Sequence, residues 1–241
     1  MYTREEFEHM RKEEAKRMFL DKKLINQMSK ILQKADSYHW IHQTTFAGEP
    51  SLQLPQDLFA IQEIIYKTKP TTIIEVGVCW AGTSLFISHL KRTGLVIAID
   101  KYIPEDLKKR VENKNKGNCD LCFIEGDSVS NDVLELVKKY KFGDSTFIIL
   151  DSNHTHEHVY QELKLYSQFL NVGDYIVVCD TIIEDFEDDK TSRERPWGKG
   201  NNPRTALQQF LKENTNFEID TDIQNKLLLS CQPDGYIRRI K

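Results

Sequence analysis

Short hydrophobic runs alternate with amphipathic, helix-length segments from residue 71 to residue 211 of this 241-residue chain. The runs are rich in β-branched residues and too short for helices, so each is predicted to be a buried strand. The five predicted strands are Thr72–Val76, Val96–Asp100, Leu121–Glu125, Ser145–Asp151 and Asp174–Asp180. Alternation of this kind is typical of an α/β protein, with a mostly parallel sheet and helices on both faces.

Apolar residues at helical spacing predict the helices between these strands. One predicted helix begins near Gly82, and three others cover Pro104–Asn115, Val129–Tyr140 and Pro203–Leu211. A further helix, after the fourth strand, is predicted from the apolar stripe Val159, Leu163 and Tyr166. Ahead of the sheet, Leu58, Ile61, Ile64 and Ile65 form one stripe, for which Asp57 is the expected N-cap. Residues 4–34 predict an N-terminal helical extension of one or two helices.

The C-terminal residues FEIDTDIQNKLLLSCQPDGYIRRI predict an antiparallel hairpin whose two strands are joined by the turn Pro233-Asp234-Gly235. The polar stretch Ile183–Asn202 lacks an apolar period, and long loops of this kind are often lids over active sites. We therefore expect its Arg195 and Trp197 to face a ligand.

Composition excludes several classes of protein. A net charge of −4 and a pI near 6.0 provide no basic field for nucleic acid. Five cysteines without small-scaffold spacing indicate a reduced, cytoplasmic protein. The first residues are too charged for a signal peptide, and no apolar run reaches membrane-spanning length. We expect neither a nucleic-acid nor a membrane partner.

The segment Thr71–Phe86 carries the first chemical signal, a strand, a glycine-bearing turn and a helix. Glu75 and Asp100 end neighbouring strands where ligands bind in open α/β sheets, and Gly77 permits close backbone approach. The chain has neither the Gly-x-Gly-x-x-Gly turn that binds pyrophosphate nor a phosphate-binding loop. A cofactor with ribose hydroxyls and a cation but no phosphate, S-adenosylmethionine, fits this turn. The alternative is a structural strand–turn–helix.

Further acids stand at the ends of the later strands: Asp127 follows the third strand, Asp151 ends the fourth and Asp180 ends the fifth. Carboxyl ends of parallel strands meet at one crevice, so these side chains are expected to converge. Asp151 and Asp180 end adjacent strands and offer the hard oxygen ligands that Mg²⁺ or Mn²⁺ prefers. Helix capping and backbone hydrogen bonding are the structural alternative.

Three histidines, at positions 154, 156 and 158, stand just after Asp151. His154 is placed to act as a general base, with capping as its alternative. An iron site would need a facial set of histidine and carboxylate ligands, whose third member is not evident in the sequence. His156 and His158 are predicted to be structural.

From about Trp40 to the C-terminus, the chain resembles the cephalosporin hydroxylase/rhamnosyl O-methyltransferase family. The matching segments are LQLPQDLFAIQEII, IIEVGVCWAGTSLF, ILDSNHTHEHV, IVVCDTIIED, RPWGKGNNP and DGYIRRI. The resemblance implies a Rossmann-like class I methyltransferase that uses S-adenosylmethionine and, in several members, magnesium. It places a metal-binding acid at Asp151 and a base at His154. Where relatives carry Glu-Asp, this chain has Cys179-Asp180, so Glu184 or Asp185 substitutes, the metal binds weakly, or none binds.

Together these signals predict an O-methyltransferase acting on a small acceptor: a sugar, a nucleotide-sugar or another secondary metabolite. Residues 1–56 are expected to form a helical extension and acceptor-side cap, residues 57–241 the methyltransferase domain, and the protein a homo-oligomer. The predicted cofactor contacts are Glu75, Gly77, Thr83, Ser84, Asp100, Asp127 and Ser128, and the predicted acceptor contacts are Gln53, Asp57, Arg195 and Trp197. The rivals are an iron-dependent hydroxylase and a non-catalytic sugar-nucleotide binding protein.

Overall fold

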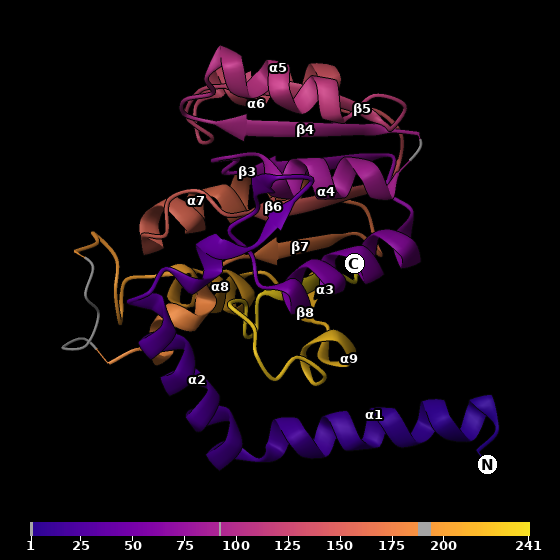
Figure 1. The fold of residues 1–241 in the computed structure, drawn as a ribbon, viewed down its shortest axis with the longest axis vertical. Helices are drawn as coiled ribbons and strands as arrows, with labels where there is room; N and C mark the ends of the chain where they lie inside the picture. Colours follow the sequence, from indigo (N-terminus) through magenta and orange to yellow (C-terminus); the bar gives the residue numbers. More distant parts are fainter. Residues whose placement is uncertain (1, 92, 188–193) are drawn as a thin grey trace.

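A computed structural model describes residues 2–91, 93–187 and 194–241 of the chain. Seven strands form one sheet in the order β5-β4-β3-β6-β7-β9-β8, in which β3 to β7 are parallel and β9 and β8 are antiparallel (Figure 1). The strands are β3 Thr72–Val76, β4 Leu95–Asp100, β5 Asp120–Glu125, β6 Thr146–Leu150, β7 Tyr175–Val178, β8 Phe217–Ile219 and β9 Tyr236–Arg239. The predicted α/β class and the five parallel strands are confirmed.

Helices cover both faces of the sheet, as predicted. They are α3 Pro55–Thr68, α4 Gly82–Leu90, α5 Glu105–Lys114, α6 Asn131–Tyr140, α7 His156–Tyr166 and α8 Pro203–Glu213. Successive strand residues alternate between the faces, so Ile74 packs with the α6–α8 side and Ile73 with the α3–α4 side. All five residues of β3 are buried, as expected for a central parallel strand.

Two local predictions were wrong. Leu54, not Asp57, is the N-cap of α3, and Pro55 is its first residue. The Asp57 carboxylate is fully buried and accepts hydrogen bonds from distant residues, so it is unavailable as a cap. The Pro233-Asp234-Gly235 turn precedes β9 but does not join it to β8. Residues 220–235, which include the short helix α9 Thr221–Gln224, form that connection.

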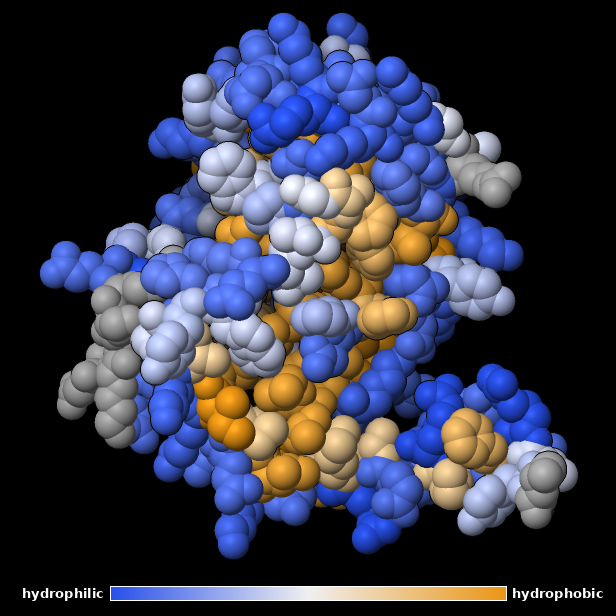
Figure 2. All heavy atoms as spheres, viewed as in Figure 1, coloured by the Kyte–Doolittle hydropathy of each residue, from blue (hydrophilic) through white to orange (hydrophobic). Residues whose placement is uncertain are grey.

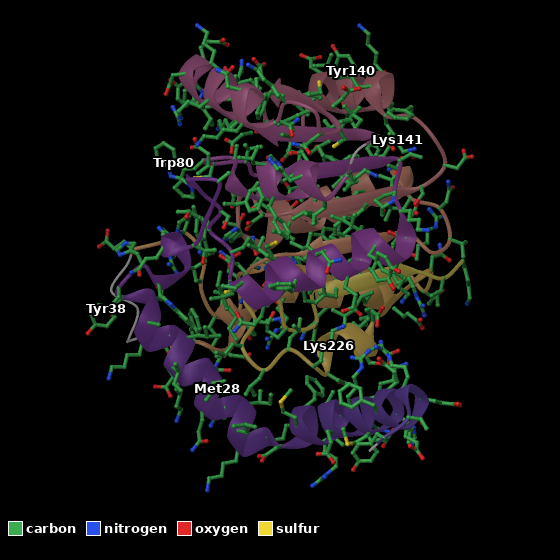
Figure 3. The ribbon with its side chains drawn as sticks, turned by 45° about the vertical axis from the view of Figure 1, so that its right-hand side comes forward. Met28, Tyr38, Trp80, Tyr140, Lys141 and Lys226 are labelled. Carbon is green, nitrogen blue, oxygen red and sulfur yellow. The ribbon has the colours of Figure 1, made fainter. Side chains whose placement is uncertain are left out.

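The N-terminal extension is two helices, α1 Arg4–Leu20 and α2 Lys22–Asp36, and α1 has no buried residue. Figure 1 shows α1 apart from the sheet. Figure 2 shows hydrophobic side chains gathered near α2 and the C-terminal segment, by which we mean residues 220–235 between β8 and β9. Met28 on α2 faces that segment, which also carries Lys226 (Figure 3). Among the described residues, no helix combines the length and apolarity needed to cross a bilayer.

A small hairpin that the sequence did not predict connects the extension to the sheet. Its strands are β1 Thr45–Phe46 and β2 Glu49–Pro50, and Glu49 is paired with Arg110 and Lys114 of α5. The hairpin also packs closely against the start of α4. A Cβ on Gly82 would lie 2.3 Å from the Pro50 carbonyl oxygen, so the two backbones can approach only because residue 82 is glycine. Residues 50–52 are thereby held over the carboxyl end of the sheet.

Candidate active site

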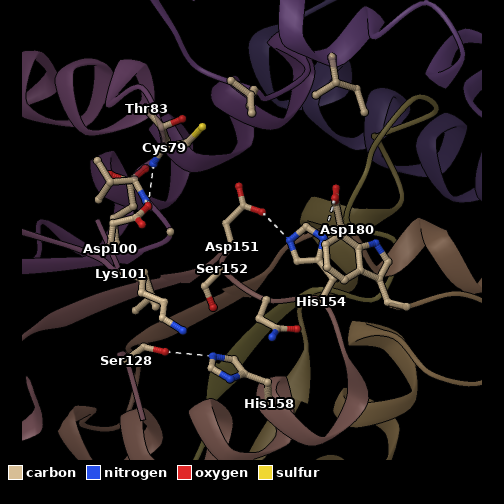
Figure 4. Close-up of a pocket in the computed structure, with 18 of the residues that line it drawn as sticks. Cys79, Thr83, Asp100, Lys101, Ser128, Asp151, Ser152, His154, His158 and Asp180 are labelled. Carbon is tan, nitrogen blue, oxygen red and sulfur yellow. Dashed lines mark hydrogen bonds and ion pairs between the residues drawn. The ribbon is translucent and has the colours of Figure 1, made fainter. Parts of the chain in front are cut away.

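A cavity of about 550 Å³ opens at the carboxyl ends of the parallel strands, where the sequence predicted the acids to converge (Figure 4). Eleven of the predicted site residues line it: Glu75, Gly77, Thr83, Asp100, Asp127, Ser128, Asp151, His154, Asp180, Arg195 and Trp197. The other three predicted residues, Ser84, Gln53 and Asp57, do not line the cavity. Asp36, His42, Lys101 and His158 line the cavity and were missed.

The turn after β3 is shaped by the protein's own backbone. Gly77 has φ +93°, and a Cβ there would lie 2.0 Å from the Asp151 carbonyl oxygen, so only glycine fits against the backbone that follows β6. Cys79 and Ala81 are also left-handed, at φ 48° and 60°. The turn therefore holds a conformation that side chains rarely adopt, which is common where binding sites store strain.

Asp100 holds this turn in place. Its Oδ2 accepts hydrogen bonds from the backbone N–H groups of Val78 at 2.8 Å and Cys79 at 2.9 Å, and its Oδ1 accepts one from Tyr102 at 3.2 Å. A carboxylate has about four lone-pair sites. Capacity remains on Asp100 for the hydroxyl groups of a ligand in the cavity.

Glu75 lies on the cavity floor with 2% of its surface exposed, and it accepts a hydrogen bond from Ser84 Oγ. Ser84 therefore acts through Glu75 and does not face the cavity itself. Burial raises the pKa of Glu75 to about 8, with smaller contributions from the charges of Asp151 and Asp100. Without a bound cation, this carboxyl group carries a proton at neutral pH.

This raised pKa predicts a stability change on removal of the acid. The folded state holds the Glu75 proton from about pH 4.5 to about pH 8, whereas the unfolded state releases it, so wild-type stability falls as pH rises through that window. Glu75→Gln should remove the part of this pH-dependent loss of stability that is due to Glu75. At about 1.4 kcal/mol per pKa unit, that part of the free energy of unfolding is on the order of a few kcal/mol. Urea unfolding of both proteins at several pH values checks this. Parallel pH profiles would contradict it.

Asp151 and Asp180 flank His154 at the ends of β6 and β7. His154 Nε2 lies 3.4 Å from Asp151 Oδ1, and Nδ1 lies 3.1 Å from Asp180 Oδ2. Burial lowers the pKa of His154, but the charge of Asp180 and the contact with Asp151 outweigh burial and raise it to about 10. The predicted proximity of the two acids is confirmed, since β6 and β7 are paired strands.

The geometry of these three side chains suits a divalent cation. One ligand atom from each lies within 4.8 Å of the others. Both buried ring nitrogens of His154 lack a hydrogen bond of good geometry to any described residue. Burial raises the pKa of the Cys179 thiol, so this residue stays neutral and is a poor ligand for a hard cation.

Glu184 and Asp185, the expected substitute metal ligands, are paired with residues outside the cavity. Glu184 accepts hydrogen bonds from the Gly200 N–H at 2.8 Å and from the Asn202 side chain at 2.5 Å. Asp185 forms a bidentate pair with Arg204, at 2.6 and 2.8 Å. Neither lines the cavity. Asp151 and Asp180 therefore remain the oxygen donors of the site.

The Asp57 carboxylate does not reach the cavity, contrary to the predicted acceptor contact. It accepts hydrogen bonds from Ser230 Oγ at 2.6 Å, Tyr236 Oη at 2.7 Å and the Cys231 N–H at 2.9 Å. Burial raises its pKa to about 6 despite these donors. Asp57 thus anchors the C-terminal segment to the start of α3.

The remaining histidines differ in role. His156 contacts Thr205 at 2.8 Å and Gln209 at 2.9 Å, which ties α7 to α8 and agrees with its predicted structural role. His158 instead lines the cavity, 3.1 Å from both Ser128 Oγ and the buried Glu162 Oε1 (Figure 4). The i, i+4 spacing of His158 and Glu162 was the sequence signal for this pair.

The predicted lid, Ile183–Asn202, lines one side of the cavity with Ile183, Phe186, Arg195 and Trp197, and its residues 188–193 lie outside the described residues. Arg195 Nη2 contacts both carboxylate oxygens of Asp36, at 2.9 and 3.0 Å. The Trp197 ring packs on His154, with centroids 4.9 Å apart. The described part of the lid thus reaches both the end of α2 and the acid–histidine cluster.

The sheet order and the cavity at its carboxyl edge define the class I methyltransferase fold. A solved structure of CmcI-D160 with Mg-SAM has a TM-score of 0.56 at 18% identity, covering 83% of this chain and 78% of its own. An O-methyltransferase from Bacillus cereus, in complex with SAH, has a TM-score of 0.52 at 13% identity, covering 90% of each chain.

Sequence comparison identifies the family. The family model described as rhamnosyl O-methyltransferase/CmcI matches residues 38–240, so the chain belongs to this family. The rhamnosyl O-methyltransferase of Mycobacterium bovis is 26% identical, covering 85% of this chain and 84% of its own. That of Mycobacterium leprae is 30% identical, covering 61% of this chain and 67% of its own.

Proposed function

We propose that this protein transfers the methyl group of S-adenosylmethionine to a hydroxyl group of a small sugar-like acceptor, assisted by a divalent cation. The observation that carries the proposal is the placement of His154 between Asp151 and Asp180, in the same cavity as Glu75 and Asp100. Family membership and the names of the relatives support O-methyl transfer to a sugar.

The cofactor would lie along the ends of β3, β4 and β5. Glu75, Gly77 and Thr83 are placed for its methionine end, where a positive ammonium group would favour the ionised form of Glu75. Asp100 would accept hydrogen bonds from the ribose hydroxyls. Asp127 and Ser128 would meet the adenine edge.

The reaction needs an acceptor hydroxyl aligned with the sulfonium carbon and a group that takes its proton. Asp151 and Asp180 would hold Mg²⁺ or Mn²⁺, which when bound supplies positive charge that lowers the pKa of a nearby hydroxyl. His154 accepts the proton as the oxygen–carbon bond forms and the carbon–sulfur bond breaks. The products are a methyl ether and S-adenosylhomocysteine.

The acceptor would enter between the lid and the end of α2. Trp197 presents an aromatic face, while Asp36 and Arg195 present charged groups that can hydrogen-bond hydroxyls. Residues 1–56 would then serve as an acceptor-side cap beside the domain formed by residues 57–241. The exposed helix α1 would be available to a second copy in a homo-oligomer.

Ligand-induced stabilisation tests the cofactor assignment. S-adenosylmethionine or S-adenosylhomocysteine should stabilise the fold by about 2–4 kcal/mol at saturation, whereas NAD should not. Asp100→Ala should lose most of this gain, because Asp100 both shapes the turn and faces the ribose. Asp120→Ala, at the opposite end of the neighbouring strand, is the control and should keep it. Equal stabilisation by NAD in a thermal-shift assay would contradict the assignment.

The two rivals make different predictions. An iron-dependent hydroxylase needs two histidines and a carboxylate on one metal. Among the described residues the cluster contains one histidine, and His156 and His158 are bonded elsewhere. A non-catalytic sugar-nucleotide binding protein would bind a ligand yet leave S-adenosylmethionine unconsumed. Product analysis separates both from methyl transfer.

A further inference from the structure

Two buried amides connect the C-terminal segment to Asp151. Gln232 Nε2 donates to Gln53 Oε1 at 2.7 Å, and Gln53 Nε2 donates to Asp151 Oδ2 at 2.7 Å. The glutamines are 1% and 3% exposed. An ionised carboxylate can only accept, so Asp151 orients the Gln53 amide, and the Gln53 oxygen then orients Gln232.

The backbone around each glutamine is constrained by neighbouring residues. The buried Asp57 accepts from Ser230 and from the Cys231 N–H, which fixes the segment from which Gln232 projects. On the other side, Leu52 has the left-handed φ of +49°, an unfavourable conformation for leucine. Leu52 lines the cavity while Gln53 lies beneath it, buried against Asp151. Strain at such a position is often retained where it serves a site.

The arrangement leaves the Asp151 carboxylate in one defined orientation. Gln53 Nε2 donates a hydrogen bond to Asp151 Oδ2, while Asp151 Oδ1 lies 3.4 Å from His154 Nε2. The Gln53 Nε2 also lies 3.8 Å from the Cys179 sulfur. A neutral thiol is a weak acceptor, so Asp151 is the strong acceptor of the Gln53 amide. With cysteine at position 179, the Gln53 amide therefore donates its strong hydrogen bond to Asp151.

We propose that Gln53 and Gln232 are positioning residues for Asp151, through which the C-terminal segment sets the affinity of the site for a divalent cation. The proposal rests on the cation site of the proposed function. Partners that orient a metal ligand typically account for about 10–100-fold in metal affinity. In this chain, two amides 179 positions apart in the sequence would supply that effect.

Mn²⁺ binding tests the proposal without any need for turnover. The electron paramagnetic resonance signal of free hydrated Mn²⁺ is followed as ion is added to the full-length protein. Gln53→Ala should weaken binding by about 10–100-fold, and Gln232→Ala should weaken it by less. The double variant should bind no more weakly than Gln53→Ala, because Gln232 acts through Gln53.

Gln224→Ala is the matched control, since Gln224 is a buried amide of the same segment that donates to Asp234 at 2.7 Å. It should bind Mn²⁺ like the wild type. Wild-type affinity in both Gln53→Ala and Gln232→Ala would overturn the relay and leave the proposed function standing. A wild-type protein that binds no Mn²⁺ would overturn the relay and the cation site together. If Gln53→Ala does not fold, Gln232→Ala decides by the same criterion.

Discussion

His154→Ala should lower turnover by roughly 10²–10⁴-fold, the range typical of a lost general base. The imidazole lies between Asp151 and Asp180, on the side of the cavity that the lid residue Trp197 covers. Cofactor stabilisation should stay near the wild-type value, because the ring does not contact Glu75 or Asp100. Steady-state kinetics with an acceptor that the wild type methylates, together with a thermal-shift assay, measures both effects.

The pH dependence gives a second measure of the same role. Only the neutral imidazole accepts a proton, so the logarithm of turnover should rise with pH. The flanking carboxylates raise the pKa of His154 to about 10, which extends the rise above neutral pH. Added Mg²⁺ should move the rise to lower pH, since its charge opposes the imidazolium.

His156→Ala is the control for this substitution. Its ring contacts Thr205 and Gln209, so the change should affect stability more than turnover. Near-normal turnover in His154→Ala would assign this residue to a structural role. A loss of Mn²⁺ affinity in that variant, in addition to the loss of rate, would make His154 a metal ligand.

Asp151→Ala should abolish most of the cation-dependent rate, and a chelator should do the same to the wild type. Both effects follow because Asp151 and Asp180 are the oxygen donors of the cluster, and hard cations need such donors. Mg²⁺ or Mn²⁺ should restore activity to the chelated wild type and not to the variant. Rates measured across a metal titration check this.

Cys179→Ser provides the comparison at the residue that precedes Asp180. Its thiol is buried and neutral, so turnover should change far less than in Asp151→Ala. Full wild-type turnover in excess chelator would remove the cation from the mechanism. The family membership and the fold would be unaffected by that result.

Local patterns predicted most of the sheet. Thr72–Val76 was predicted with the observed bounds because β3 is buried on both faces, which gives a continuous apolar run. The meeting of Asp151 and Asp180 followed from the geometry of parallel strands. These features depend on residues close in sequence or on a general rule of sheet topology.

Features that depend on distant partners were not predictable in this way. The local sequence predicts Asp57 as a helix cap. In the fold its carboxylate accepts hydrogen bonds from Ser230 and Tyr236, which are more than 170 positions away. The pairing of Asp36 with Arg195 spans 159 positions. The placement of β9 between β7 and β8 is a matter of strand order, which hydrophobic periodicity does not encode.

Incubation with methyl-labelled S-adenosylmethionine and a panel of sugar acceptors, rhamnosides included, tests the central claim most directly. Mass spectrometry of the products should show the labelled methyl group on an acceptor oxygen and an equal amount of S-adenosylhomocysteine. An acceptor that gains an oxygen atom without the label, or S-adenosylmethionine that remains unconsumed across the panel with Mg²⁺ present, would contradict it.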